Sequence, residues 1–225
     1  MRIISALIVA SLLLVATACS SNRKPAQSDA AMAAQASQVD EAKEPQINAR
    51  TRLAAGQLAE SQGNLAAAMK QYEEALKIDP KSQPALYRLG LVQAQAKRFD
   101  DAIETWKRYV KATDGSASAY SNLGFCHELA GHRAEAEAAY KKGIAKDPKN
   151  EPCRVNYGLM LARAGRVGDA VVQLQAVLAP AEVAYNLASV YEQQGKRELA
   201  KEQYRQALEL DPEFQDARAR LAKLP

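Results

Sequence analysis

Cysteine and histidine are scarce in this chain of 225 residues, which contains three cysteines and two histidines. No two cysteines form a CxxC pair, and His127 and His132 lack partners at the spacing that a zinc site requires. The sequence therefore predicts no metal site and no bound cofactor.

Catalytic motifs and clustered charge are also missing. The sequence has no phosphate-binding glycine loop, no nucleophile elbow and no His-Glu metal motif. Lys and Arg total 30 against 26 Asp and Glu, and the two signs alternate along the chain, which argues against nucleic-acid binding. His127 occupies a position typical of a packed core, while Glu135 and Glu137 are typical of a solvated face. We expect a protein that is not an enzyme and has no nucleic-acid partner.

Only one apolar stretch is long, residues 3–15, and it is too short to cross a bilayer as a mature helix. It follows a short positive start and precedes small residues, which is the build of an export signal. Cys19 resembles the lipidated residue of a bacterial lipobox, although leucine is commoner than Ala16 at the first position of that motif. We predict that residues 1–18 are removed and that Cys19 carries a palmitate-type lipid anchor. The alternative is an ordinary signal peptide cut after Ala18, with an incidental cysteine.

The residues after Cys19 contain almost no large apolar side chain, so residues 19–48 are predicted to be a flexible tether. Ser20, in place of aspartate, resembles the sorting pattern of lipoproteins that reach the outer membrane. The expected location is the cell envelope, and the periplasmic face of the outer membrane if the host has two membranes.

The rest of the sequence repeats one formula with a period of 34 residues, and a fixed period of this length points to a helical repeat array. The recurring residues are Gly63, Ala68, Tyr72 and Asp79-Pro80; Gly131, Ala136, Tyr140 and Asp147-Pro148; and Gly195, Ala200, Tyr204 and Asp211-Pro212. Alignment on these residues gives five units, at 49–82, 83–116, 117–150, 151–180 and 181–214.

Each unit is predicted to form two helices joined by a tight turn. Apolar or small residues recur at i, i+3, i+4 and i+7 in the first helix, and the second contains an alanine and an aromatic residue. Glycine suits a left-handed turn after the first helix in four units, whereas the second unit has Lys97 there and is expected to turn in another way. Pro80, Pro148 and Pro212 are expected to end second helices. Trp106 stands in an aromatic position and is predicted to lie in the core.

These units resemble the tetratricopeptide repeat, whose pattern has Leu-Gly in the first helix, alanine and an aromatic residue in the second, and proline at the close. The resemblance covers residues 49–225. It implies an all-α fold, a right-handed superhelical solenoid of antiparallel helix pairs whose first helices line a concave groove. Residues 213–224 match an extra capping helix, with Phe214, Leu221 and Leu224 on its apolar face.

The fourth unit is four residues shorter than the others. Four residues make about one helical turn, so the apolar face is kept while the connection shortens. We predict a local change of superhelix pitch between the fourth and fifth units, with a notch, which regular stacking across residues 178–184 would contradict. The alternative is that the shortening has no effect.

Asn122, Asn156 and Asn186 recur at one position of the first helices. The resemblance implies that they face the groove, where a carboxamide can both donate to and accept from the backbone of a bound segment. The same register places nine further residues in the groove: Tyr87, Arg88, Leu91, Phe125, Leu129, Val155, Leu159, Arg163 and Tyr185. The alternative is that the asparagines satisfy local backbone groups or reflect the repeat's consensus. The basic residues that clamp a terminal carboxylate in chaperone-binding members are missing beside these asparagines.

Cys126 and Cys153 lie at different heights on the first helices of adjacent units, about 10 Å apart along the axis. A disulfide requires Cα atoms within about 7 Å of each other. We therefore expect two free, largely buried thiols.

We interpret the chain as a membrane-anchored scaffold that binds an unknown protein or peptide segment in its concave groove. By layout it resembles pilotin and pilus-assembly lipoproteins, so assistance in assembling an envelope complex such as a pilus is the expected role. The alternative is a structural scaffold that associates with itself and has no peptide ligand.

Overall fold

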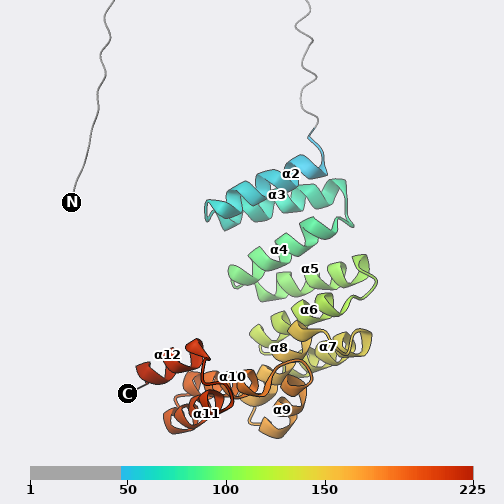
Figure 1. Cartoon of the computed structure of the whole chain (residues 1–225). Helices are drawn as coiled ribbons and strands as arrows, with labels where there is room; N and C mark the ends of the chain where they lie inside the picture. Colours follow the sequence, from blue (N-terminus) through green and yellow to red (C-terminus); the bar gives the residue numbers. More distant parts are fainter. Residues whose placement is uncertain (1–46, 225) are drawn as a thin grey trace, which may run out of the picture. The chain divides into compact units, whose positions relative to one another are not determined.

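The structure is a computed structural model that describes residues 47–224. The predicted signal segment, Cys19 and nearly all of the predicted tether lie outside the described residues. Residues 47–224 form 11 helices and no strand, and these stack in chain order as antiparallel pairs (Figure 1). None of these helices combines the length and the apolar character that crossing a membrane requires. The all-α solenoid expected from the sequence is confirmed.

Five helix pairs and one single helix make up the described stack. The first helices of the pairs are α2 (Ala49–Ser61), α4 (Gln83–Gln95), α6 (Ala117–Leu129), α8 (Glu151–Arg163) and α10 (Pro180–Gln193). The second helices are α3 (Leu65–Ile78), α5 (Phe99–Ala112), α7 (Arg133–Lys146), α9 (Val167–Gln175) and α11 (Arg197–Leu210). The last helix, α12 (Gln215–Lys223), packs on α11 and caps the stack.

Every pair turns through one residue with left-handed backbone. These residues are Gly63, Lys97, Gly131, Gly165 and Gly195, with φ of 73°, 60°, 82°, 79° and 71°. The second pair thus makes the same turn as the others, and the expectation that it turns in another way was wrong. The left-handed region costs a residue with a side chain about 1 kcal/mol, so Lys97 is held there by the two helices that it joins.

The aromatic residue of the second helix packs directly on the glycine of the first. Trp106 is 1% exposed, and a Cβ atom added to Gly90 would lie 2.6 Å from its ring. The first and third pairs repeat this contact with Gly56 and Tyr72, and with Gly124 and Tyr140. Since a methyl group has no room there, glycine sets how closely the two helices approach. The prediction that Trp106 lies in the core is confirmed.

The prolines lie just beyond the second helices, as predicted. Pro80, Pro148 and Pro212 each stand two residues after the end of α3, α7 or α11. The aspartate before each proline caps the turn, because its carboxylate accepts a hydrogen bond from the backbone N–H two residues further on, at 3.0 to 3.1 Å. Asp-Pro therefore ends the helix and shapes the entry to the next pair.

The fourth pair has a short second helix. α9 has 9 residues where the other second helices have 14, and the chain turns through residues 176–178 before α10 begins at Pro180. A pocket of about 430 Å³ lies at this junction, lined by residues of α9, α10 and α11 that include Val171, Leu187 and Leu210. This pocket agrees with the predicted notch, and the change of superhelix pitch between the fourth and fifth pairs stays a prediction.

Both cysteines of the described part are buried and unpaired, as expected. Cys126 is 2% exposed and Cys153 is 0% exposed. Burial raises the pKa of each thiol to about 11, which keeps both protonated at neutral pH. They act as small apolar residues of the core.

Candidate functional site

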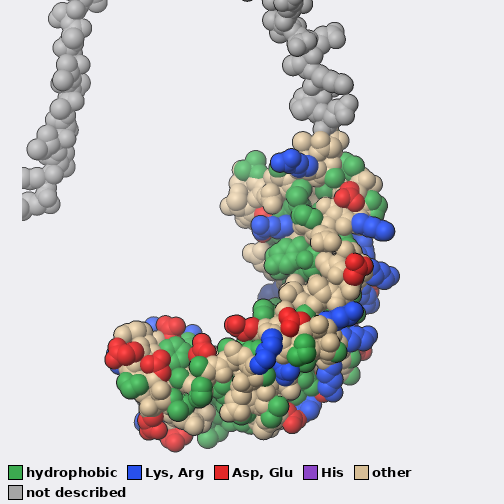
Figure 2. Space-filling view, turned by 45° about the vertical axis from the view of Figure 1, so that its right-hand side comes forward, with side chains coloured by type: hydrophobic (Ala, Val, Ile, Leu, Met, Phe, Trp, Pro, Cys, Tyr) green, Lys and Arg blue, Asp and Glu red, His purple; other side chains and the backbone are tan. Residues whose placement is uncertain are grey.

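Four large apolar side chains stand exposed on the first helices α4 and α6. Tyr87 and Leu91 lie one turn apart on α4, with 38% and 37% exposure. Phe125 and Leu129 lie one turn apart on α6, each 42% exposed. We call these four residues the apolar strip. Hydrophobic side chains also gather at the level of α4 and α5 in the space-filling view (Figure 2).

The strip is a second apolar face on helices that already bury one. On α4 the side chains of Leu86, Leu89 and Val92 are at most 2% exposed and pack into the core. Residues of an α-helix that face the core recur every three to four positions, so Tyr87 and Leu91 fall beside that face and reach the surface. Each of the two helices therefore exposes a pair of apolar side chains, and exposed apolar groups of this kind can mark binding surfaces.

Tyr87 is held in place by two aromatic neighbours on α5. Its ring lies edge-on to Trp106, with 5.5 Å between centroids, and 5.8 Å from Tyr109. Trp106 and Tyr109 are themselves 5.4 Å apart in an edge arrangement. Such aromatic contacts fix ring orientation, so Tyr87 presents a rigid surface to a partner.

The three asparagines differ in what they bind. The side-chain amide of Asn156 donates to the Ser121 hydroxyl at 3.2 Å, across α8 and α6. The amide of Asn186 donates to the backbone carbonyl of Glu182 at 2.8 Å. Asn122 makes no side-chain hydrogen bond within residues 47–224. The alternative, in which the asparagine satisfies a local backbone group, is therefore seen for Asn186 alone, whereas Asn156 links two first helices and Asn122 keeps its carboxamide available.

Arg88 and Arg163 were predicted to line the groove, and both are engaged within the stack. Arg88 forms an ion pair with Glu60 at 3.3 Å, and Arg163 forms one with Glu128 at 2.6 Å. Each pair joins a first helix to the first helix of the preceding pair. These guanidinium groups therefore have carboxylate partners before any ligand arrives.

The remaining groove residues are packed to a large extent. Val155 and Leu159 are half-buried against the core between the third and fifth pairs. Tyr185 is half-buried and lies 5.6 Å from the ring of Tyr204 and 5.0 Å from that of Phe214. The open part of the predicted groove is therefore the apolar strip together with Asn122.

Sequence reasoning missed a bridge that recurs in alternate pairs. In the first, third and fifth pairs, a tyrosine of the second helix donates a hydrogen bond from its hydroxyl to a glutamate of the first helix. The same glutamate forms an ion pair with an arginine of α4, α8 or α12, respectively. The sets are Tyr72, Glu60 and Arg88; Tyr140, Glu128 and Arg163; and Tyr204, Glu192 and Arg220. Burial raises the pKa of all three tyrosines. The sequence pattern that could have predicted these bridges is a glutamate 12 residues before each of the three tyrosines.

His127 is a core residue, as predicted. It is 9% exposed, and burial lowers the pKa of its imidazole, which favours the neutral form. Within residues 47–224 no three His, Cys, Asp or Glu side chains are grouped so that they could hold a metal ion.

Comparison with known families and proteins gives consistent matches. Models of the tetratricopeptide repeat match residues 23–83, 59–123, 117–150 and 181–214. The Hsp70-Hsp90 organizing protein of Triticum aestivum is 33% identical over 98 residues, which cover 44% of this chain and 17% of that protein. The chain spans only 13 to 28% of the length of the first three curated relatives that it matches.

Two solved structures illustrate the shared fold. YrrB, described as a repeat protein with an unusual peptide-binding site, is 21% identical with a TM-score of 0.53, and the match covers 77% of this chain and 91% of YrrB. PilW, described as a widely conserved type IV pilus biogenesis factor, is 22% identical with a TM-score of 0.58 over 72% of this chain and 76% of PilW. At these identities the likeness concerns the fold.

Proposed function

Because the chain belongs to the tetratricopeptide repeat family, we propose that it binds a protein or peptide partner, and that the apolar strip on α4 and α6 is the contact surface. The exposure of Tyr87, Leu91, Phe125 and Leu129, in pairs one helical turn apart on two successive first helices, is the observation that carries the proposal. The peptide binding named for YrrB and the chaperone-organizing role named for the wheat relative support this class of function.

The chemistry of the strip suits a partner segment with its own apolar side chains. Two pairs spaced by one helical turn can hold side chains from an amphipathic helix or from an extended segment. Asn122 lies on the same helix as Phe125 and supplies a carboxamide that can bond a backbone amide. The apolar strip would supply most of the contact area with the partner segment, and Asn122 would fix the orientation of its backbone.

The test is capture of partners by crosslinking in the native cell, with wild type compared to a double variant Leu91→Ser and Phe125→Ser. Loss of the partners that wild type captures, with helix content unchanged by circular dichroism, is the expected result. Leu199→Ser is the matched control, because Leu199 is 49% exposed on the second helix α11, away from the strip. Equal capture by the double variant would refute the strip as the binding surface. A mass that rises with concentration in purified protein, without a partner, would favour the self-associating scaffold.

We also propose that Cys19 carries a lipid that holds the repeat domain at the cell envelope, on the periplasmic face of the outer membrane in a host with two membranes. The lipobox-like residues before Cys19 support this, and the name of PilW supports a role in assembling an envelope complex such as a pilus. Cys19→Ser should move the protein from the membrane fraction to the soluble fraction, while Cys126→Ser should not. A Cys19→Ser protein that stays with the membranes would contradict the anchor.

A further inference from the structure

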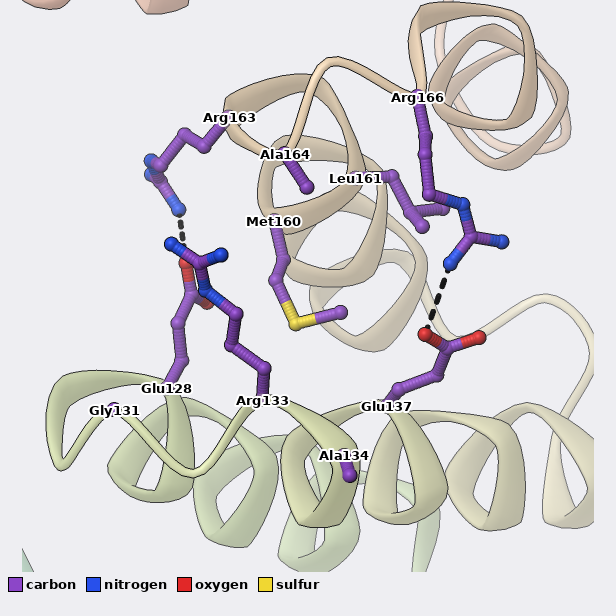
Figure 3. A pocket seen from close by; sticks show the side chains of 10 residues that line it. All are labelled: Glu128, Gly131, Arg133, Ala134, Glu137, Met160, Leu161, Arg163, Ala164 and Arg166. Carbon is purple, nitrogen blue, oxygen red and sulfur yellow. Dashed lines mark hydrogen bonds and ion pairs between the residues drawn. The ribbon is translucent and has the colours of Figure 1, made fainter.

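A second candidate site lies between the third and fourth pairs, away from the apolar strip. It is a pocket of about 370 Å³ formed by the end of α6, the start of α7, the end of α8 and the turn into α9 (Figure 3). Met160 and Leu161 of α8 stand between its charged sides, and they are 7% and 1% exposed. The side chains of Glu128, Arg163, Glu137 and Arg166 lie at its two sides.

The pocket lies where the third pair departs from the pattern of its neighbours. In the first, second and fourth pairs, the first and fifth residues of the second helix are apolar. These residues are Leu65 and Met69, Phe99 and Ile103, and Val167 and Val171. Met69 and Ile103 are 8% and 4% exposed, so they fill their junctions. The third pair has Arg133 and Glu137 at these positions. Long charged side chains turn their ends toward water, which leaves the space above Met160 open.

Both carboxylates of the pocket already have cationic partners. Glu137 accepts hydrogen bonds from Tyr157 at 2.8 Å and Arg166 at 3.0 Å, and pairs with Lys141 at 2.8 Å. The bond from Lys141 is the main cause that lowers the pKa of Glu137 to about 2. Glu128 accepts from Arg163 at 2.6 Å. Both carboxylates therefore already have hydrogen-bond and ion-pair partners, so they do not call for a cationic ligand.

Arg133 is the charge at this pocket that lacks a partner. It forms no ion pair within residues 47–224, and it is exposed. In Figure 3 its side chain rises from the start of α7 on the side of the pocket where Glu128 and Arg163 are drawn. An arginine in this position can bind a carboxylate through two parallel hydrogen bonds. The ligand that completes the site is therefore anionic at one end and apolar where it meets Met160, Ala134 and Ala164.

We propose that this pocket binds a peptide segment in which a large apolar side chain adjoins a carboxylate. The apolar side chain contacts Met160, Ala134 and Ala164, and the carboxylate bonds the guanidinium of Arg133. The carboxylate can belong to an Asp or Glu side chain or to the C-terminus of the segment. This site is separate from the asparagine positions of the groove, where basic residues are missing, and it adds a second specificity to the strip.

The chain supplies its own reporter for this site, since it has four methionines. Met160 lies in the pocket, and Met69 stands at the filled position of the first junction. The protein is labelled with ¹³C at its methionine methyl groups and titrated with three short peptides while the methyl NMR signals are recorded. The peptides are an amidated peptide that contains Leu-Glu, the same peptide with Leu-Gln, and a peptide that ends in leucine with a free carboxylate. Saturable movement of the Met160 signal, with Met69 unmoved, is expected for at least one carboxylate peptide. The tighter of the two identifies the source of the carboxylate, and the Leu-Gln peptide should bind at least about tenfold more weakly.

Variants then test the residues. Arg133→Ala should weaken binding of the carboxylate peptide about tenfold, and Arg133→Lys by less, because it keeps the charge but loses the two-pronged geometry. Arg205→Ala is the control, since Arg205 is an exposed arginine on α11 without an ion pair in the described stack. Glu137→Met, which copies the first pair, should fill the pocket and block binding while circular dichroism shows a folded protein.

Two results would overturn the proposal: a Met160 signal that responds to none of the peptides at millimolar concentration, or unchanged affinity in Arg133→Ala. The Leu91→Ser and Phe125→Ser variant should bind these peptides as wild type does. The proposal for the pocket and the proposal for the apolar strip can therefore be refuted independently of each other.

Discussion

At the scale of single residues, backbone conformation and close contact determine how each pair is built. Four of the five interhelix turns use glycine, and the fifth uses Lys97 at a φ of 60°. A Cβ atom on Gly131 would meet no atom within 4 Å, so space is not what glycine provides at that turn. What it provides is access to the left-handed region without steric cost.

Lys97→Gly should therefore stabilise the protein. Removing the side chain relieves the left-handed strain, and the expected gain is about 1 kcal/mol in the free energy of unfolding, measured by urea denaturation. Gly131→Ala is the reciprocal change and should destabilise by a similar amount. A Lys97→Gly protein no more stable than wild type would mean that the lysine side chain makes compensating contacts.

The same scale explains what could be predicted from the sequence. The turn glycines, the buried Trp106 and the ends at proline follow from local rules, because each depends on residues within one unit. Glu137 was interpreted as a residue of a solvated face, yet it bonds Tyr157 and Arg166 of the next pair. Contacts between units join residues 20 and 29 positions apart, and helical periodicity within one unit does not predict them.

At the scale of elements, Glu137 joins α7 to the two helices of the next pair. Its carboxylate receives Tyr157 from α8 and Arg166 from the turn before α9. At the position where other junctions have a second apolar side chain, this junction therefore has polar bonds to an ionised group, beside the apolar cluster that includes Tyr140 and Leu161. Part of the strength of this junction therefore depends on the charge of Glu137.

This junction should weaken in acid. Because the pKa of Glu137 falls to about 2 in the folded protein, below its ordinary value of 4.5, the ionised carboxylate favours the folded state above about pH 4.5. That contribution is lost as pH falls through about 2. The difference in free energy of unfolding between wild type and Glu137→Gln should be largest near neutral pH and shrink steadily below about pH 4.5.

Urea denaturation at a series of pH values measures this difference. Glu135→Gln removes an exposed carboxylate from the same helix that forms no ion pair in the described stack, so it serves as the control. A constant difference between wild type and Glu137→Gln down to about pH 2 would show that the carboxylate does not support the fold.

At the scale of the whole described stack, each pair contacts mainly its neighbours, so stability is a sum of pairs and junctions. The short α9 makes less contact with α10 than the other second helices make with the helix that follows them. Leu187, 6% exposed, is one of the residues that hold this junction, in a cluster with Leu161 and Leu174. The stack should therefore separate most readily between the fourth and fifth pairs.

Leu187→Ala should loosen the last helices selectively. The substitution costs about 2 to 5 kcal/mol in buried contact. In hydrogen exchange, amides of α10 and α11 should exchange faster, while those of α3 and α5 keep their wild-type rates. Leu86→Ala at the first junction should give the converse pattern. Uniform acceleration in both variants would instead show that the stack unfolds as one unit.

The alternation of the Tyr-Glu-Arg bridges has a consequence for the effect of dissolved salt. Within residues 47–224, ion pairs between neighbouring units occur after the first, third and fifth pairs, through Glu60, Glu128, Glu137 and Glu192, and not after the second or fourth. The Debye length falls from about 10 Å at 0.1 M salt to about 3 Å at 1 M, so concentrated salt weakens charged contacts and spares apolar ones. High ionic strength should therefore weaken the junctions after the first, third and fifth pairs more than those after the second and fourth. The order of the helices stays the same, but the relative rigidity of successive junctions changes.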